Sequence, residues 1–414
     1  MNEYLELLRS NTHFRRLWLG AVASFLGDWF NTIALYVLVQ RLTGSPLALG
    51  AVFITKMLPF ALASPLAGLL TDRFDRRRLM IATDLLRAVV VLGFLAVDHA
   101  SDLPLLYGLI TLQVVLGAVF FPARMASIPN ITTPHQLAAA NVLSAATWSV
   151  LLAVGAALGG LVTDWLGVRA VFVLDSLSYC VSAIFIYHTV IPQETDPPAP
   201  GSQLAAAVRD IADGWRQMIR RPEIGRIAVA KAAWSLGGGG LVFMLAMLGE
   251  RLMPAAPAVG IGVLYSVRGI GTGVGPVLAR RLVPDERRWP RIIGLGVAAT
   301  GVGYLAVAAG AWDWWWVALL VGLAHAPSGV NWVFSSVLLQ RRTEDRLRGR
   351  VLSTQFLLLT LADTLSILVA ALLLELGGLE LAPTILGFAL FQILCGLAWT
   401  AWVVPAESRR PSPV

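Results

Sequence analysis

The stretch Gly68-Leu69-Leu70-Thr71-Asp72-Arg73-Phe74-Asp75-Arg76-Arg77-Arg78 decides how this sequence folds. It places a glycine, two aspartates and four arginines between two long apolar segments, at 47–70 and 79–97. So short a polar segment is too small to form a domain between them. It therefore predicts the link of a hairpin whose two helices cross a membrane.

The composition demands a lipid environment for the rest of the chain as well. Of the 414 residues, 57% are hydrophobic and 14% are charged, and the mean hydropathy is +0.71. This leaves too little polar surface for a soluble globular protein. About 20 apolar residues cross the hydrocarbon core, and we expect an all-α fold of twelve membrane spans. The expected spans are 17–39, 47–70, 79–97, 104–127, 141–163, 169–191, 225–249, 258–280, 290–311, 314–339, 349–376 and 381–404.

The arginines predict the orientation of these spans. Lys and Arg in short loops are retained on the cytoplasmic side, and most arginines fall in the tails and in the links after odd-numbered spans. Arg41, Arg169 and Arg251 fall on the opposite side. We therefore expect a protein of the cytoplasmic membrane with both termini in the cytoplasm. The net charge of +7 is explained by arginines at one membrane face near anionic lipid, and not by nucleic-acid binding.

The spans form two groups of six joined by a polar linker. The linker begins with four prolines and continues with apolar residues at alternating steps of four and three, which predicts an amphipathic helix on the cytoplasmic leaflet. Thr133–Leu137 and Thr343–Leu347 each precede the fifth span of their group, a weak repeat that indicates duplication. The predicted parts are an N-terminal bundle at 1–191, the linker at 192–224, a C-terminal bundle at 225–404 and a tail at 405–414.

The two lysines of the chain, Lys56 and Lys231, both lie within apolar spans. A lysine at membrane depth costs several kcal/mol unless it is paired or hydrated. Asp28 is the expected partner of Lys56, because helix geometry places them about 16 Å and about 21 Å from the cytoplasmic ends of their spans. Lys231 lies early in its span, where its ammonium group can reach the membrane surface.

Asp28 has two interpretations. It is either a titratable carboxylate that carries a coupling proton or meets a cationic substrate, or half of a static ion pair with Lys56. Asp363 and Asp175 are the other deep acids, and Asp363 is, with Lys56 and Lys231, a further candidate for coupling or substrate binding. The candidates for lining a cavity are Gln113, Arg124, Trp148 and Asn331, which are equally explained as helix-packing contacts.

Two other patterns indicate packing. Asp84 and Arg87 lie one helical turn apart, which predicts an ion pair. The glycines of 269–275 alternate along one segment, and those four residues apart let another helix approach closely.

Sequence patterns for enzymes are missing. Neither lysine follows a glycine, so no phosphate-binding loop with Gly-Lys-Ser/Thr is present, and neither H-E-x-x-H nor G-x-S-x-G occurs. We therefore expect no enzyme activity, cofactor or metal.

The 68–78 stretch matches the G-x-x-x-D-R-x-x-R-R signature of the major facilitator superfamily, which the chain resembles over nearly its whole length. Within that superfamily it is similar to the twelve-span drug:proton exporters that include macrolide and enterobactin exporters. The similarity lies in Asn11-x-x-Phe14-Arg15-x-Leu17-Trp18, Leu26-Gly27-Asp28, Pro122-Ala123-Arg124 and Arg348-Gly349-Arg350-Val351. One departure is Gly155-Ala156-Ala157-Leu158-Gly159-Gly160, which lacks the proline of the branch's G-P-x-x-G-G.

The resemblance implies two bundles that alternate between inward- and outward-open states, a gating motif and proton-driven export. The implied gating residues are Gly68, Asp72, Arg73, Arg76 and Arg77, with Asp72 holding the inner gate near the start of span 11. We expect a monomer that exports an amphipathic or hydrophobic small molecule in exchange for protons. The alternatives are uptake or facilitated diffusion of a metabolite and, in another class, a membrane sensor or scaffold that transports nothing.

Overall fold

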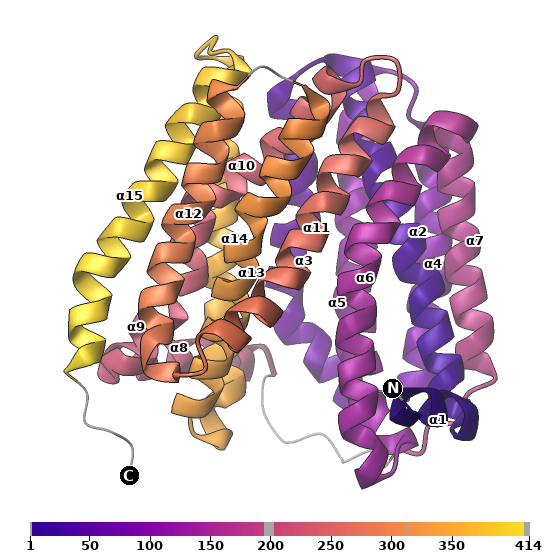
Figure 1. The fold of residues 1–414 in the computed structure, drawn as a ribbon. Coiled ribbons are helices and arrows are strands. Elements are labelled where there is room, and N and C mark those ends of the chain that lie inside the picture. Colours follow the sequence, from indigo (N-terminus) through magenta and orange to yellow (C-terminus); the bar gives the residue numbers. More distant parts are fainter. Residues whose placement is uncertain (1, 194–202, 311–312, 410–414) are drawn as a thin grey trace. The chain divides into compact units, whose positions relative to one another are not determined.

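The computed structural model describes residues 2–193, 203–310 and 313–409, and within these ranges it is built of helices without a strand (Figure 1). Twelve of the described helical segments are long and apolar enough to cross a membrane, as the sequence predicts. The helices are α1 (Asn2–Ser10), α2 (Thr12–Thr43), α3 (Pro46–Arg73), α4 (Arg76–Gly93), α5 (Leu103–Ile131), α6 (Pro134–Leu166), α7 (Val168–Tyr187), α8 (Gln203–Arg220), α9 (Pro222–Ala228), α10 (Ala230–Leu252), α11 (Pro257–Leu282), α12 (Trp289–Ala309), α13 (Trp314–Arg342), α14 (Asp345–Glu375) and α15 (Leu381–Ser408).

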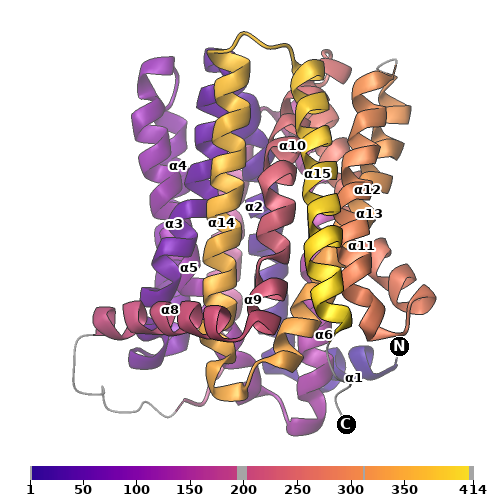
Figure 2. The same cartoon turned by 90° about the vertical axis from the view of Figure 1, so that its left-hand side faces the viewer.

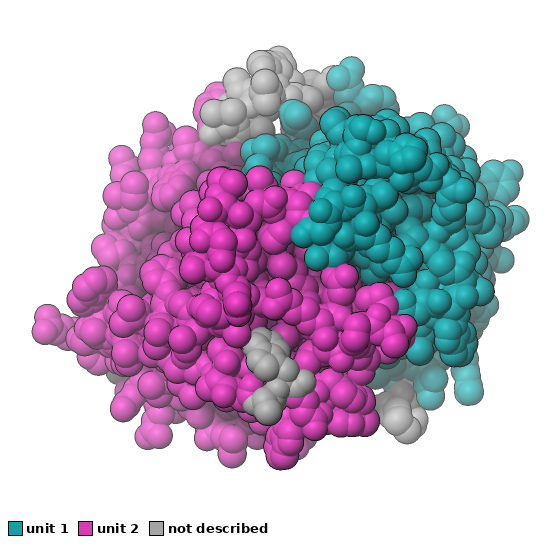
Figure 3. Space-filling model, turned by 90° about the horizontal axis from the view of Figure 1, so that it is seen from above, with its two compact units in different colours: residues 1–44, 54–207 teal, residues 45–53, 208–414 magenta. Residues whose placement is uncertain are grey.

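The helices gather into two compact units (Figure 3). Unit 1 comprises 1–44 and 54–207, and unit 2 comprises 45–53 and 208–414. Within unit 1, α2 packs against α6 and α7, and α4 packs against α5 and α7. Within unit 2 the corresponding spans pair in the same way, since α10 packs against α14 and α15, and α12 packs against α13 and α15. This shared pattern is what an internal duplication produces.

The link at 68–78 is shorter than its sequence suggests. Helix α3 continues to Arg73 and α4 begins at Arg76, because Asp75 caps α4 by accepting a hydrogen bond from the backbone N–H of Arg78 at 2.7 Å. A Cβ on Gly68 would meet no atom within 4 Å, so packing within the described structure does not require glycine there. The side chain of Asp72 lies outside the described part of the chain.

Two of the implied gating arginines bind the ends of neighbouring helices of unit 1. Arg76 Nη1 donates to the backbone oxygen of Ala126 on α5 at 2.8 Å. Arg77 donates to the backbone oxygen of Tyr187 at the end of α7 and lies over its ring, 5.2 Å from the centroid. The carbonyl of Tyr187 at the end of α7 has no partner within its helix, and the Arg77 guanidinium satisfies it. Both side chains therefore tie α4 to its neighbours, whereas Arg73 lies over Phe74, 5.8 Å from that ring.

Glycines bring helices together in both units. A Cβ on Gly159 of α6 would lie 3.1 Å from Phe30 Cα of α2, the helix that carries Asp28. A Cβ on Gly275 of α11 would lie 2.0 Å from the backbone oxygen of Ala326 on α13. The expectation that glycines of the 269–275 segment permit a close helix approach is thus confirmed at Gly275.

Helix α8 lies in the linker, where the sequence predicts an amphipathic helix. Figure 2 shows α8 running across α14, near the end where α14 begins. Gly214 makes the crossing close, because a Cβ there would lie 2.5 Å from the backbone oxygen of Arg350. The proline-rich segment before α8 lies mostly outside the described residues.

Candidate functional site

Asp28 stands at the centre of a polar network inside unit 1. Its Oδ1 accepts a hydrogen bond from the hydroxyl of Tyr179 on α7 at 2.5 Å. That hydroxyl in turn accepts from Gln113 Nε2 of α5 at 3.0 Å. Tyr179 and Gln113 are buried and Asp28 is half-buried. Three helices therefore contribute to one chain of hydrogen bonds that ends at a carboxylate.

A second carboxylate lies beside the first. Asp175 on α7 is fully buried, and its Oδ2 accepts from Asn31 Nδ2 of α2 at 2.7 Å. A Cβ on Gly27 would lie 2.5 Å from Asp175 Oδ1, so glycine next to Asp28 is what lets α7 come this close. Asn31 Oδ1 is buried without a partner among the described residues. Both carboxylates are thus placed by the close contact of α2 with α7.

Lys56 on α3 supplies positive charge to this pair of carboxylates. It is half-buried and lies within electrostatic reach of Asp28 and of Asp175. An opposite charge at such range offsets part of the cost of burying the two carboxyl groups. The direct hydrogen-bond donor to Asp28 is nevertheless Tyr179, and the lysine acts on both acids as a shared counter-charge.

The predicted ion pair between Asp84 and Arg87 forms, deep within unit 1. The side chain of Asp84 is fully buried and that of Arg87 is 4% exposed. The guanidinium carbon lies 4.4 Å from the ring centroid of Tyr179 and 4.6 Å from that of Phe120. Arg87 therefore joins the ion pair to the ring whose hydroxyl binds Asp28.

The charges of this site do not balance among the residues that the structure describes. Asp28, Asp84 and Asp175 supply three carboxyl groups, against the two cations Lys56 and Arg87. An uncompensated charge within a membrane protein is costly. One additional proton neutralises the set, and this is the chemistry that the arrangement makes available.

The other cavity candidates of unit 1 occupy different surroundings. Arg124 on α5 is 5% exposed and lies over the rings of Phe25 and Phe121, at 5.1 Å and 5.9 Å. Its Nε is buried without an acceptor among the described residues. Trp148 on α6 is 53% exposed, so unit 1 does not enclose it. Arg124 is therefore a buried cation available to an anionic group, and Trp148 offers an open aromatic surface.

Lys231 in unit 2 is held by neutral groups. It is 7% exposed and donates to Ser336 Oγ at 2.7 Å and to Gln355 Oε1 at 3.4 Å. Its Nζ also lies 4.3 Å from the ring centroid of Trp332. We expected the Lys231 ammonium group to reach the membrane surface, but it makes these internal contacts instead. A hydroxyl, an amide and an aromatic ring take the place of water around it. Asn331, the cavity candidate of this unit, is 2% exposed and donates to the backbone oxygen of Ala230 at 3.3 Å.

Asp363 on α14 lies against a wall of glycines in α10. It is 9% exposed, and a Cβ on Gly239 would lie 2.9 Å from its Oδ1. Arg268 on α11 is within electrostatic reach of Asp363. Nearby, Gln392 of α15 is fully buried against Gly237, and both of its amide atoms lack partners among the described residues. The α10–α15 contact of unit 2 thus has a neutral amide where the α2–α7 contact of unit 1 has carboxylates.

The comparison with known families decides what kind of protein holds these sites. The model of the Major Facilitator Superfamily matches residues 17–362. This chain belongs to the Major Facilitator Superfamily. It is therefore a multi-pass membrane transporter with a small-molecule substrate, and not an enzyme.

Relatives of this major facilitator transporter support the same assignment. It is 28% identical to the uncharacterized MFS-type transporter y4rN of Sinorhizobium fredii over 345 residues, which cover 81% of this chain and 82% of that protein. It is 29% identical over 183 residues, 44% of this chain and 45% of the other, to a Bacillus subtilis protein named "Putative bacilysin exporter BacE". It also shares its fold with a bacterial homolog of the human lysosomal transporter Spinster. That structure has a TM-score of 0.73 and 16% identity, over 98% of this chain and 99% of the other.

Sequence reasoning left Tyr179 out of the transporter's candidate site. Tyr179 follows Asp175 by four residues, so both lie on one face of α7, and that spacing was the available signal. The direction of that face toward α2 could not be read from the sequence, because it depends on which spans pack together.

Proposed function

We propose that this transporter exports an amphipathic or hydrophobic small molecule in exchange for protons, and that Asp28 carries the coupling proton. The observation that carries the proposal is the buried network of unit 1. There, Asp28 accepts a hydrogen bond from Tyr179 and lies within electrostatic reach of Lys56. A carboxylate with a nearby counter-charge can exchange a proton for a cationic or polar partner. In this proposal the protein acts as a monomer in the cytoplasmic membrane, with both ends in the cytoplasm.

The hydrogen bonds around Asp28 suit two protonation states. In the ionised state the carboxylate accepts from Tyr179, which accepts from Gln113 Nε2. When Asp28 holds a proton it becomes a donor, and the Tyr179 hydroxyl then needs another acceptor. Gln113 Oε1 is buried without a partner among the described residues, and rotation of this amide would present it. The network can therefore reverse its direction by exchanging which Gln113 amide atom lacks a partner, from Oε1 in the ionised state to Nε2 in the protonated state.

Export is favoured over uptake by the partial likeness to BacE, whose name describes an exporter. The likeness covers less than half of this chain, and it supports only the direction of transport. The implied resemblance to drug:proton exporters points the same way.

The test is substrate-induced proton movement in proteoliposomes, with a substrate taken from a susceptibility screen of a deletion strain. Exchange requires that an imposed substrate gradient drives protons in the opposite direction. We expect Lys56→Met to shift the pH optimum of this exchange without abolishing it, because the lysine acts as a shared counter-charge. Substrate flux without proton movement would instead indicate facilitated diffusion, and no flux at all would favour a sensor or scaffold.

A further inference from the structure

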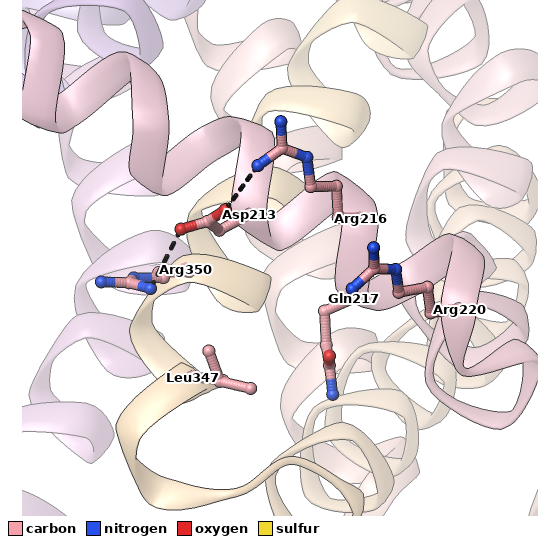
Figure 4. Close-up of a pocket in the computed structure, with 6 residues that line it drawn as sticks. All are labelled: Asp213, Arg216, Gln217, Arg220, Leu347 and Arg350. Atoms are coloured by element: carbon pink, nitrogen blue, oxygen red, sulfur yellow. Dashed lines mark hydrogen bonds and ion pairs between the residues drawn. The ribbon is translucent and has the colours of Figure 1, made fainter.

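A cavity of about 280 Å³ lies between α8 and the beginning of α14, far along the chain from the network of Asp28. Figure 4 shows its lining side chains extending from the two helices. We call this cavity the linker pocket. It is lined by Asp213, Arg216, Gln217 and Arg220 of α8 and by Leu347 and Arg350 of α14.

The linker pocket is strongly basic. Asp213 accepts from Arg216 at 3.2 Å through Oδ1 and from Arg350 at 3.2 Å through Oδ2, so its charge is already shared between two arginines. Arg220 has no hydrogen bond or ion pair within the described part of the chain (Figure 4). The lining therefore holds three guanidinium groups and one carboxylate. A pocket with this balance attracts anions.

The pocket also has a neutral donor that lacks an acceptor. Gln217 Nε2 is buried and forms no hydrogen bond with the described residues. A buried donor without an acceptor costs free energy, and an anionic oxygen in the pocket would relieve that cost. Guanidinium groups present paired N–H donors that match the oxygens of a phosphate group. Phosphate is therefore the chemistry that fits these donors best.

Helix α8 holds the donors in a fixed arrangement. Asp213, Arg216, Gln217 and Arg220 recur at helical spacing and share one face. A different face is anchored on α14, because Met218 is buried and Thr354 Oγ1 donates to the backbone oxygen of Ile211 at 3.4 Å. The pocket wall therefore does not need to assemble when a ligand arrives.

Two apolar side chains of α8 remain outside this packing. Trp215 is 38% exposed and Ile219 is 73% exposed, one helical turn apart. Exposed apolar residues on an amphipathic helix with arginines are typical of helices at the membrane surface. Lipid headgroups and soluble phosphate esters are both available there.

We propose that the linker pocket binds a phosphate ester, with Arg216, Arg220 and Arg350 as its charged contacts and Gln217 as a neutral donor. The ester belongs either to the headgroup of an anionic phospholipid or to a soluble molecule. In both cases the bound phosphate joins α8 to α14, and it does so independently of the coupling role of Asp28.

The test compares two double variants of the full chain that lose the same charge. R216Q/R220Q removes two pocket arginines, and R280Q/R281Q removes two exposed arginines at the end of α11, outside the pocket. Native mass spectrometry counts bound phosphatidylglycerol. Thermal unfolding in detergent tests for binding of a soluble phosphate ester. The melting temperature is compared between inorganic phosphate and chloride at equal ionic strength. If R216Q/R220Q fails to fold, R220Q alone replaces it, because Arg220 has no described partner to leave unpaired.

We expect the pocket variant to lose about tenfold or more in affinity for one of these probes, while the control stays within about twofold of the wild type. Loss of phosphatidylglycerol binding assigns the site to a lipid headgroup, and loss of stabilisation by phosphate alone assigns it to a soluble ester. Equal losses in both double variants, or no loss in either, would overturn the proposal.

Discussion

The two units repeat one helix arrangement but treat buried charge differently. In unit 1, α2 and α7 carry Asp28 and Asp175, with Tyr179 as a direct hydrogen-bond partner. In unit 2, the matching pair α10 and α15 carries glycines and the neutral Gln392. The matching helix pairs therefore share their packing but not their charge, and unit 2 carries its deep acid, Asp363, on α14 instead. The carboxylates at this helix contact therefore belong to unit 1, which is where we propose the coupling site.

The largest expected effect is a difference in the free energy of unfolding between variants that remove a buried cation from unit 1 and from unit 2. Arg87→Met leaves Asp84 fully buried without its counter-charge, and we expect it to lower the free energy of unfolding by about 3–5 kcal/mol. Lys231→Met removes a cation whose contacts with Ser336 and Gln355 are to neutral groups, so we expect a change of less than about 1 kcal/mol. Denaturant unfolding in detergent measures both.

A rescue variant controls for lost packing in this comparison. Asp84→Asn combined with Arg87→Met removes both charges, and it should recover most of the stability lost by Arg87→Met alone. Failure of the rescue would mean that contacts of Arg87 with aromatic rings, and not charge pairing, hold unit 1 together at this position.

Glycine-to-alanine variants at the helix contacts of the two units should differ less in stability. Gly275→Ala places a Cβ 2.0 Å from a backbone oxygen, and overpacking of this kind costs about 1–3 kcal/mol. Gly159→Ala meets its nearest neighbour at 3.1 Å and should cost less. Gly273→Ala on the same helix as Gly275 meets nothing within 4 Å and is the matched control. Equal melting temperatures for the variants at 275 and 273 would show that the close approach of α11 and α13 carries no packing constraint.

The smallest expected effect distinguishes two buried tyrosines. Tyr179→Phe removes the donor to Asp28, so the ionised carboxylate loses stabilisation and the pH profile of transport should move by about one unit to higher pH. Tyr304→Phe removes a hydroxyl bonded to His325 in unit 2 at 2.8 Å and should leave the profile in place. Transport assayed between pH 5 and pH 9 compares them. Identical shifts for both would remove Tyr179 from the coupling network.

The fold was largely predictable because lipid imposes a simple rule on span length. Helix α6 shows where the rule loses accuracy, since it begins at Pro134 and not near 141. Thr133 accepts from the backbone of Gln136 and the Gln136 side chain accepts in return, a capping box that extends the helix beyond its apolar part. The sequence contains this capping signal, but a span prediction from hydropathy alone does not use it.

The site was predictable only in part. Depth along a span identified Asp28 and Lys56, because a charge in lipid is rare. The direct partner of Asp28 depends on how α2, α5 and α7 face one another, and single-helix periodicity does not fix that. Asp84 and Arg87 were predicted as a pair because their contact lies within one helix.

Gradient-driven flux of two matched variants tests the central claim most directly. Asp28→Asn and Asp363→Asn each remove one deep carboxylate, from unit 1 and unit 2 respectively, with little change in side-chain shape. In proteoliposomes with an imposed pH gradient, we expect Asp28→Asn to be inserted normally but to lose proton-dependent flux, while Asp363→Asn retains it. Full gradient-driven transport by Asp28→Asn, with loss in Asp363→Asn, would contradict this account and place coupling in unit 2.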